Sequence, residues 1–319
     1  MDATQLHLFR KAEAKPGLRE IAEAVRGGGV GSLPTAVARA DNARYQEIEA
    51  RSALTRAQGM FFRWALNPYR GCTHACEYCY ARKYQRHLEL GTGDDFSSFI
   101  LVKTNLPAVL ARELNRPSWQ RESVAVGTAT DGYQPIEGHY RLTRQCLEIL
   151  TDARTPFSIV TKGPMVVRDL DILVRATGMA GCQVFMSVAS VDDNMWAKLE
   201  PGTAPPPQRL RAIGTLARAG VDAAVLMMPL VPGFTTSRSS IERTVRAIAE
   251  SGARLAGADV ARFDPGVREH FFAFLEREQP ELLDGYRRLY GSGSRAPAPY
   301  REAVRETFKT AASGVGCRR

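Results

Sequence analysis

The sequence predicts an α/β fold, built on a parallel β-sheet whose helices lie outside it. Two observations carry this prediction. Short apolar segments alternate with amphipathic segments over most of the chain, and the apolar segments are hydrophobic at nearly every position. Strands buried on both faces have this continuous pattern, and a helix between two strands lets them run parallel. With 319 residues, 44% of them hydrophobic, the chain can bury a large core.

Residues 1–60 are interpreted as a partly helical N-terminal extension. Helical patterns cover Leu18–Val25 and Ala38–Arg51, and Gly27–Gly29 lie between them. A glycine run of this kind is typical of a hinge or linker. We assign no chemistry to this part of the chain.

Residues 61–262 are expected to form the core domain. Its predicted strands are short and apolar, and they cover Phe61–Leu66, Phe99–Lys103, Val124–Gly127, Phe157–Val160, Cys182–Val188, Val221–Leu230 and Leu255–Val260. Its predicted helices lie between the strands, and they cover Tyr80–Leu90, Leu106–Leu114, Tyr140–Thr151, Val167–Ala176, Asp193–Leu199, Gln208–Ala219 and Ser240–Ser251. Residues 263–319 are expected to form C-terminal helices, which include Val267–Tyr290, and a tail. Periodicity does not show whether the sheet closes.

The segment Gly71–Tyr80 holds three of the six cysteines, and it follows the first predicted strand of the core. Cys72, Cys76 and Cys79 have the spacing Cys-x3-Cys-x2-Cys, so one loop can wrap three thiolates around a small inorganic centre. Structural zinc sites usually have four protein ligands, often from two paired Cys-x2-Cys segments, and no second such pair is present. The ligand count and spacing favour an iron-sulfur centre with one coordination position open. A zinc site that uses His74 as the fourth ligand is the alternative.

Polar residues lie at or after the ends of several predicted strands. They are Asn67–Arg70, Thr128–Glu137, Thr161–Gly163, Ser187 and Ser190. Ligands of parallel sheets bind at the carboxyl ends of the strands. Each of these segments alone is an ordinary loop, but their recurrence at equivalent positions predicts that they line one pocket.

Composition gives weaker evidence about where the protein is located and what it binds. The first fifteen residues lack the apolar stretch of a signal peptide, and no apolar run is long enough to cross a membrane, so we expect a soluble, cytoplasmic protein. The net charge of +9 is compatible with binding to a nucleic acid. The basic residues are spread along the chain among acids, so an ordinary solvated surface explains them equally well.

The cysteine motif and its neighbours resemble the radical S-adenosylmethionine (SAM) superfamily, and within it the proteins related to spore photoproduct lyase. The resemblance begins at Asn67–Arg82 with the sequence NPYRGCTHACEYCYAR and covers about residues 60–260. Further matches follow in the same order, at Gly127–Asp131, Tyr133–Pro135, Glu137, Val160–Lys162, Ser187, Glu200–Pro201 and Pro229–Gly233.

The resemblance implies a partial (β/α)6 barrel similar to a TIM barrel, with a [4Fe-4S] cluster at its open rim. It implies that Cys72, Cys76 and Cys79 ligate the cluster and that SAM chelates the remaining iron. Tyr78 would pack near the adenine, and Thr130, Lys162 and Ser187 match positions that contact SAM. Asp131 and Glu200 would accept hydrogen bonds from the amine or the ribose. An ammonium group such as Lys162 suits the carboxylate of SAM.

One position departs from the lyase pattern. Spore photoproduct lyases carry a cysteine as hydrogen donor in the loop just before a serine-aspartate pair, and the nearest matching residue here is Thr128. The O–H bond of threonine is too strong for this role. Thymine-dimer reversal is therefore not the expected reaction, unless Cys146, Cys182 or Cys317 donates from elsewhere.

The predicted function is that of a radical SAM enzyme that cleaves SAM reductively and abstracts hydrogen from a substrate, for which a nucleic acid is one candidate class. It would take its electron from an external donor such as flavodoxin or ferredoxin. Two alternatives stay open on the sequence: a non-catalytic, metal-stabilised nucleic-acid-binding protein, and a cluster protein that binds SAM as a sensor.

Overall fold

A seven-stranded sheet forms the centre of the molecule. The computed structural model describes residues 42–57, 60, 62–88, 91–291 and 293–315. Within this part of the chain, the strands lie in the order β10-β9-β8-β7-β6-β3-β2. They are β2 (Leu54–Arg56), β3 (Trp64–Leu66), β6 (Val124–Val126), β7 (Phe157–Thr161), β8 (Cys182–Ser187), β9 (Asp222–Leu230) and β10 (Arg254–Val260). All neighbours from β3 to β10 pair in parallel, and β2 is antiparallel to β3.

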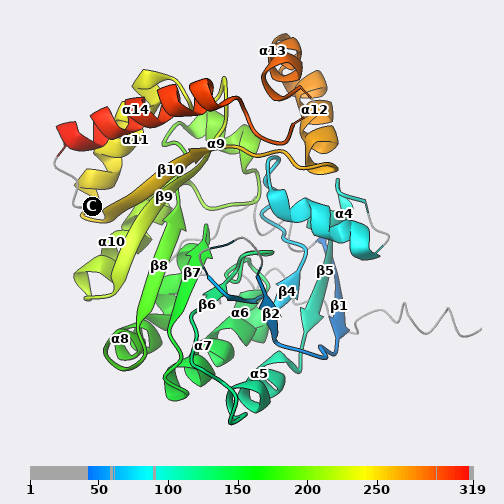
Figure 1. The fold of residues 1–319 in the computed structure, drawn as a ribbon, viewed down its shortest axis with the longest axis vertical. Helices are drawn as coiled ribbons and strands as arrows, with labels where there is room; N and C mark the ends of the chain where they lie inside the picture. The colour runs from blue at the N-terminus through cyan, green and yellow to red at the C-terminus, as the bar shows by residue number, and fades with distance from the viewer. Residues whose placement is uncertain (1–41, 58–59, 61, 89–90, 292, 316–319) are drawn as a thin grey trace, which may run out of the picture.

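Helices connect the parallel strands and cover the outer face of the curved sheet (Figure 1). Those between β6 and β10 are α6 (Glu137–Tyr140), α7 (Leu142–Asp152), the 3₁₀ segment η3 (Pro164–Asp169), α8 (Leu170–Met179), α9 (Asp193–Leu199), α10 (Pro206–Arg218) and α11 (Arg238–Glu250). Their buried residues recur at helical spacing, as with Leu142, Cys146, Leu147 and Leu150 in α7. Six parallel strands with helices outside and no pairing between β10 and β2 in the described sheet confirm the expected partial (β/α)6 barrel.

The connection from β3 to β6 carries a second, smaller sheet. Its strands are β1 (Arg44–Ile48), β4 (Tyr69–Arg70) and β5 (Phe99–Lys103), in the order β1-β5-β4. The prediction that Phe99–Lys103 belongs to the main strand-helix alternation is wrong, because β5 pairs with β1 and β4 instead. Helices α4 (Asp95–Ser98) and α5 (Leu106–Leu114) flank β5, and α5 leads back to the main sheet.

Two local predictions need correction. The helical pattern expected over Ala38–Arg51 fails where the structure describes it, because Arg44–Ile48 forms β1, parallel to β5. The pairing with β5 outweighs the local helical propensity. The segment Tyr80–Leu88 is helical as predicted, but it is the 3₁₀ segment η2. The expected helix Leu18–Val25 lies outside the described residues.

The C-terminal helices share one hydrophobic core with the barrel. They are α12 (Val267–Glu278), α13 (Pro280–Tyr290) and α14 (Ala298–Gly314). The first two lie within the range Val267–Tyr290, for which helices were predicted. Phe271, Tyr286, Tyr290 and Val304 are buried in the same cluster as the barrel residues Val184, Val225 and Leu255. In Figure 1, α14 lies across α11 beside β10, while α12 and α13 form a corner near α4.

No helix among the described residues is both long and apolar enough to cross a membrane.

Candidate active site

The cysteine loop begins at Gly71, directly after β4. Gly71 has a φ of +82°, and a Cβ atom at this position would lie 2.6 Å from the carbonyl oxygen of Phe99. Only glycine tolerates both the left-handed backbone and this close approach. The amide of Cys72 then donates a hydrogen bond to Phe96 O at 2.9 Å. The start of the loop is therefore fixed against the small sheet and α4.

Two side chains that follow β6 bind the backbone of the cysteine loop. The Thr130 hydroxyl donates to Gly71 O at 2.6 Å. Gln134 donates through Nε2 to the same carbonyl at 3.2 Å, and its Oε1 accepts from the Thr73 amide at 3.0 Å. All of these groups are buried. Thr130, which the resemblance assigns to SAM, thus holds the loop in the described structure.

Asp131 joins the cysteine loop to the end of β7. Its Oδ2 accepts from the Lys162 amide at 2.7 Å and lies 3.2 Å from His74 Nδ1, and its Oδ1 accepts from the Thr161 hydroxyl at 2.6 Å. Burial alone would raise the pKa of Asp131, but His74 and these hydrogen bonds together hold it below its usual value. Asp131 is thus ionised and bound to protein groups through both oxygens.

The far side of the loop contacts the segment after α9. The Glu77 amide donates to Leu199 O at 3.0 Å, and the Gly202 amide donates to His74 O at 3.1 Å. A Cβ atom on Gly202 would lie only 2.2 Å from the carbonyl oxygen of Thr73. Residues that follow β6 therefore hold the loop on one side, and the end of α9 with the segment after it holds the other.

The three cysteines lie together within this frame. Cys72 and Cys76 are buried and Cys79 is half-buried. Burial raises the pKa of the Cys76 thiol to about 12, and burial, followed by Asp131 and the other two cysteines, raises that of Cys72. Both thiols are neutral until a metal replaces the proton. Among the described residues, no set of three or more His, Cys, Asp or Glu is arranged around a single-ion position.

Tyr78 points to a buried ion pair. Its hydroxyl donates to Glu200 Oε1, and Glu200 Oε2 lies 2.5 Å from Arg209 Nη2. Burial would raise the pKa of Glu200, but Arg209 and Lys162 lower it below its usual value. Arg209 also donates to Ser187 O at 3.0 Å. Glu200 therefore fixes the end of β8 and the ring that precedes Cys79.

Lys162 and Ser187 keep their polar side-chain atoms free of hydrogen bonds to the described residues. The Lys162 ammonium lies 5.5 Å from the centre of the Tyr78 ring. Burial would lower its pKa, but Cys76 in its thiolate form and the Glu200 carboxylate raise it above the usual value, so the ammonium is charged beside a Cys76 that ligates a metal. A charged ammonium beside a three-thiol loop fits a cofactor that brings both a metal centre and a carboxylate.

Thr128 follows β6, and its carbonyl accepts a hydrogen bond from the Tyr80 hydroxyl. The position that matches the hydrogen donor of the lyases therefore lies beside the cysteine loop.

The other described thiols lie away from this rim. Cys146 is buried within α7. Cys182 begins β8, which ends at Ser187, so it lies roughly 16 Å from the rim at the usual rise per residue. Cys317 lies outside the described residues.

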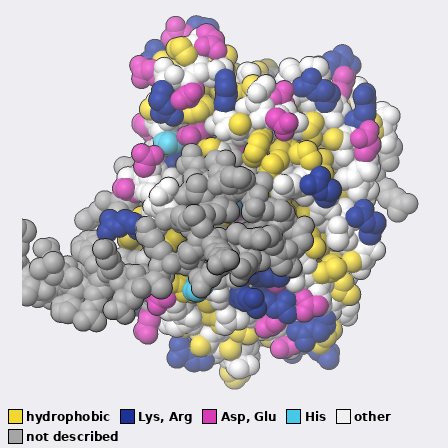
Figure 2. Space-filling model, turned by 180° about the vertical axis from the view of Figure 1, so that it is seen from behind, with side chains coloured by type: hydrophobic (Ala, Val, Ile, Leu, Met, Phe, Trp, Pro, Cys, Tyr) yellow, Lys and Arg dark blue, Asp and Glu magenta, His cyan; other side chains and the backbone are white. Residues whose placement is uncertain are grey.

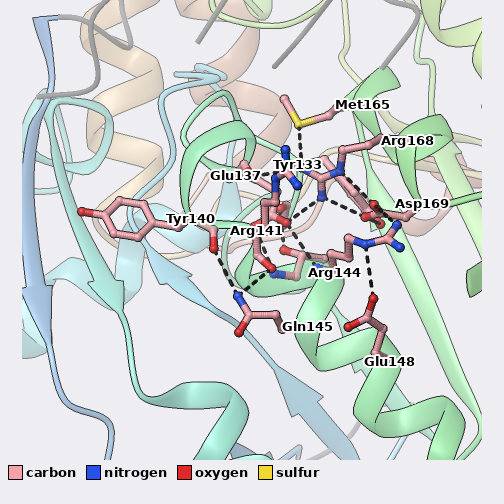
Figure 3. Close-up of polar contacts among 12 residues, drawn as sticks. Tyr133, Glu137, Tyr140, Arg141, Arg144, Gln145, Glu148, Met165, Arg168 and Asp169 are labelled. Atoms are coloured by element: carbon pink, nitrogen blue, oxygen red, sulfur yellow. Dashed lines mark hydrogen bonds and ion pairs between the residues drawn. The ribbon is translucent and has the colours of Figure 1, made fainter. Parts of the chain in front are cut away.

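Residues that follow β6 and β7 form a buried charge network (Figure 3). Glu137 accepts from Arg168 at 2.8 Å, and it also accepts from the Tyr69 hydroxyl at 2.5 Å. Arg168 continues to Asp169, which also accepts from the Tyr133 hydroxyl at 3.0 Å. Burial is the largest cause of the raised pKa of Glu137, and Arg168 opposes it. Of these residues, Tyr69, Tyr133 and Glu137 lie in motifs that the resemblance includes, whereas the sequence gives no signal for Arg168 or Asp169.

The described surface shows no single basic face in the view of Figure 2. Lys and Arg side chains lie among Asp and Glu side chains over the visible part. The many surface pairs agree with this, for example Arg238 with Glu242 at 2.9 Å and Arg305 with Glu302 at 2.6 Å. On this face, the net charge of +9 is dispersed.

Comparisons with known proteins agree with this geometry. The family model described as "Radical SAM superfamily" matches residues 66–252. An uncharacterized protein of Mycobacterium tuberculosis is 39% identical over 269 residues, which is 83% of this chain and 79% of the relative. A Radical SAM Nα-GlyT isomerase of Pseudomonas phage M6 is 28% identical over 196 residues, covering 60% of this chain and 38% of that protein.

Among solved structures, spore photoproduct lyase complexed with dinucleoside spore photoproduct is similar to this fold. The TM-score is 0.67 at 17% sequence identity, and the match covers 95% of this chain and 85% of the lyase chain. The family match spans more than half of the sequence and includes all three cysteines of the loop. The chain therefore belongs to the radical SAM superfamily, and its cofactors are a [4Fe-4S] cluster and S-adenosylmethionine.

Proposed function

We propose that Cys72, Cys76 and Cys79 ligate the [4Fe-4S] cluster and that SAM binds between the cluster and the ends of β7 and β8. The observation that carries this assignment is the charged Lys162 ammonium beside the buried Cys76, without a hydrogen bond to any described residue. When bound and reduced, the cluster supplies the electron that cleaves SAM and starts hydrogen abstraction from the substrate. The electron comes from an external donor of the flavodoxin or ferredoxin type.

The other predicted SAM contacts fall into two groups. Lys162 is proposed to bind the SAM carboxylate, Ser187 to bind a polar group of SAM with its free hydroxyl, and Tyr78 to lie near the adenine. Thr130, Asp131 and Glu200 are proposed to act mainly by holding these walls, because their polar atoms already bind Gly71, Lys162 and Arg209. Each of the six residues thus keeps a role at the SAM site, but only the first three offer groups to the ligand.

A nucleic acid is the proposed substrate class. Support comes from the similar spore photoproduct lyase structure, which is a complex with dinucleoside spore photoproduct. The reaction proposed is not thiol-assisted thymine-dimer reversal. Thr128 stands at the donor position, and Cys146 and Cys182 are buried elsewhere. The substrate radical is therefore quenched in another way or rearranges.

The test is an anaerobic SAM-cleavage assay. Protein reconstituted with iron and sulfide is expected to hold about four irons per chain and to release 5′-deoxyadenosine when dithionite and SAM are added. Cys76→Ala is expected to lose both the iron and the product. Cys182→Ala removes a buried thiol from the opposite end of β8, and it should keep both. A well-reconstituted wild type that leaves SAM intact would refute the proposed activity.

The substrate class has its own test. Single- and double-stranded DNA and RNA are titrated with the reconstituted protein at increasing salt, and each is added to the cleavage assay. A nucleic-acid substrate is expected to bind more weakly as salt rises and to increase 5′-deoxyadenosine formation. Binding that does not respond to salt, together with an unchanged rate, would exclude this class while leaving SAM cleavage intact.

A further inference from the structure

Arg82 is a buried cation that binds the backbone of the cysteine loop. It lies at the start of η2 and is 2% exposed. Its Nε donates to Cys76 O at 3.0 Å and its Nη2 donates to Ala75 O at 3.2 Å. Its Nη1 donates to the carbonyls of Thr92 and Gly93, at 3.1 and 2.8 Å. The guanidinium therefore links the part of the cysteine loop that contains Ala75 and Cys76 to the segment before α4.

One of the loop residues that Arg82 contacts, Ala75, has an unusual backbone conformation. Its φ is 53°, in the left-handed region that residues with a Cβ atom seldom adopt. The Ala75 carbonyl is one of the two loop carbonyls that Arg82 holds. Arg82 thus stabilises the turn that sets the direction of Cys76 relative to Cys72.

The charge of Arg82 has no partner of opposite sign among the described residues. Its acceptors are all carbonyl oxygens, and its guanidinium carbon lies 5.1 Å from the centre of the Phe96 ring. Arg209, which is equally buried, differs because Glu200 lies 2.5 Å away. A buried charge is costly unless it is paired.

The nearby carboxylates already have side-chain partners of their own. Glu77 lies 2.8 Å from His270, Asp131 lies 3.2 Å from His74, and Glu200 binds Arg209. The missing anion is best supplied by the group that the three thiolates hold. A [4Fe-4S] cluster with three thiolate ligands is negatively charged, and reduction adds one more negative charge.

We propose that Arg82 is a positioning residue that sets the reduction potential of the cluster, in addition to fixing the loop. This inference rests on the proposed cluster ligation. Cluster potentials depend on net charge and on the groups around the sulfurs. A buried cation favours the reduced, more negative state, so Arg82 makes the cluster easier to reduce by its external donor.

The test measures the potential of reconstituted protein directly. Wild type, Arg82→Met, Arg82→Lys and Arg254→Met are titrated anaerobically with dithionite in the presence of redox mediators, and the reduced cluster is followed by electron paramagnetic resonance. Arg254→Met is the control for the loss of one positive charge, since Arg254 begins β10 at the other end of the sheet and pairs with Asp222 at 2.8 Å. Iron content and iron loss to a chelator are measured on the same samples.

At a fixed potential, Arg82→Met is expected to lower the ratio of reduced to oxidised cluster five- to tenfold, where tenfold corresponds to about 59 mV for one electron. Arg82→Lys keeps the charge but not the fork of donors, so it should stay within about twofold of wild type while losing iron faster. Arg254→Met should match wild type in both.

Three results would overturn the inference. An Arg82→Met protein that holds four irons at the wild-type potential would show that the charge does not act on the cluster. A shift in Arg82→Lys or Arg254→Met as large as that in Arg82→Met would also contradict it. If Arg82→Met fails to hold iron, Arg82→Gln, which removes the charge but keeps a side-chain donor, takes its place, and a wild-type potential in that variant overturns the inference. If wild type cleaves SAM, the proposed function stands whatever the variants do. A wild type without a cluster would refute both.

Discussion

At the scale of single residues, the backbone amide and the side-chain ammonium of Lys162 have different surroundings. Its amide binds Asp131, while its ammonium faces Tyr78 and Cys76. Lys162→Met is therefore expected to preserve the fold and weaken SAM binding by about 10- to 100-fold, the usual worth of a hydrogen bond between charged groups. Equilibrium dialysis of SAM against reconstituted protein measures this.

The exposed Lys198 in α9 provides the matched control. Lys198→Met removes the same charge and should leave SAM affinity unchanged. An unchanged affinity in Lys162→Met would mean that another group binds the carboxylate.

Lys103 gives a residue-scale prediction about pH. Burial, and then the nearby Arg70, lower its pKa to about 8, while its ammonium donates to Asn67 O at 2.8 Å. In the unfolded chain its pKa is about 10.4. Between these values the unfolded chain holds more protons, so the contribution of Lys103 to stability is lost as pH falls from about 10 to about 8.

Lys103→Met should therefore gain stability relative to wild type at pH 7, by about 1 to 2 kcal/mol more than at pH 10, after allowance for the partial exposure of the side chain. Urea unfolding of both proteins at the two pH values measures this difference. If the difference in the free energy of unfolding between the two proteins is the same at pH 7 and pH 10, then the pKa of Lys103 is not lowered in the folded protein.

The cysteines and the polar strand ends are the residues that the sequence could identify. Spacing alone marks Cys72, Cys76 and Cys79, and position after a strand marks Thr130, Lys162 and Ser187. Spacing does not show the direction of a side chain. The sequence therefore marks Thr130 and Asp131 as candidate SAM contacts but does not show that their oxygens bind the loop and the end of β7. Arg82 ends the cysteine motif and Arg209 lies in a predicted helix, but only the folded chain shows that both are buried.

At the scale of elements, the cysteine loop depends on its close contact with the segment after α9. A Cβ atom on Gly202 would lie 2.2 Å from Thr73 O and 2.9 Å from His74 O, both backbone atoms that cannot move aside easily. Gly202→Ala is expected to displace the loop, lower the iron content after reconstitution and destabilise the protein by about 2 kcal/mol or more. Iron analysis and thermal unfolding measure the two effects.

Gly178, in helix α8, is the control for the same substitution. No atom lies within 4 Å of a Cβ atom placed there. Gly178→Ala should stabilise the protein by about 0.5 to 1 kcal/mol, because alanine favours the helix, and it should leave iron binding unchanged. Normal iron binding by Gly202→Ala would show that the loop does not need this contact.

Elements with strong local patterns were predicted well from the sequence. The six parallel strands and the helices α5, α7, α8, α9, α10 and α11 lie close to their expected ranges, since each combines a buried face with clear polar boundaries. The short helix α6 was not predicted. The small sheet was not predicted, because Arg44–Ile48 and Tyr69–Arg70 acquire strand structure only by pairing with β5. Such pairing is a long-range property that local propensity does not encode.

At the scale of the whole molecule, an aromatic cluster joins the C-terminal helices to the barrel. The Phe271 ring lies 4.5 Å from that of Phe263 and 6.4 Å from that of Phe234, which follows β9. The Tyr286 hydroxyl donates to Pro232 O at 2.6 Å. Phe271→Ala should therefore cost about 3 to 5 kcal/mol and shift a single, common unfolding transition.

The neighbouring Phe272 is only partly buried, so Phe272→Ala should cost clearly less than Phe271→Ala. Calorimetry and circular dichroism on both variants make the comparison. A separate early transition of the C-terminal helices, with the barrel transition unchanged, would contradict the view that the two parts form one folding unit.

The carboxylate of Asp131 couples the binding of the cluster to the binding of SAM. It contacts His74 within the cysteine loop and the amide of Lys162 at the proposed SAM wall, so neither side can shift without straining the other. Such a shared contact makes the two binding equilibria cooperative. Thermodynamic reciprocity then requires that whatever cluster assembly adds to SAM affinity, SAM adds to cluster retention. The protein with both cofactors should accordingly lose iron more slowly than the protein with the cluster alone.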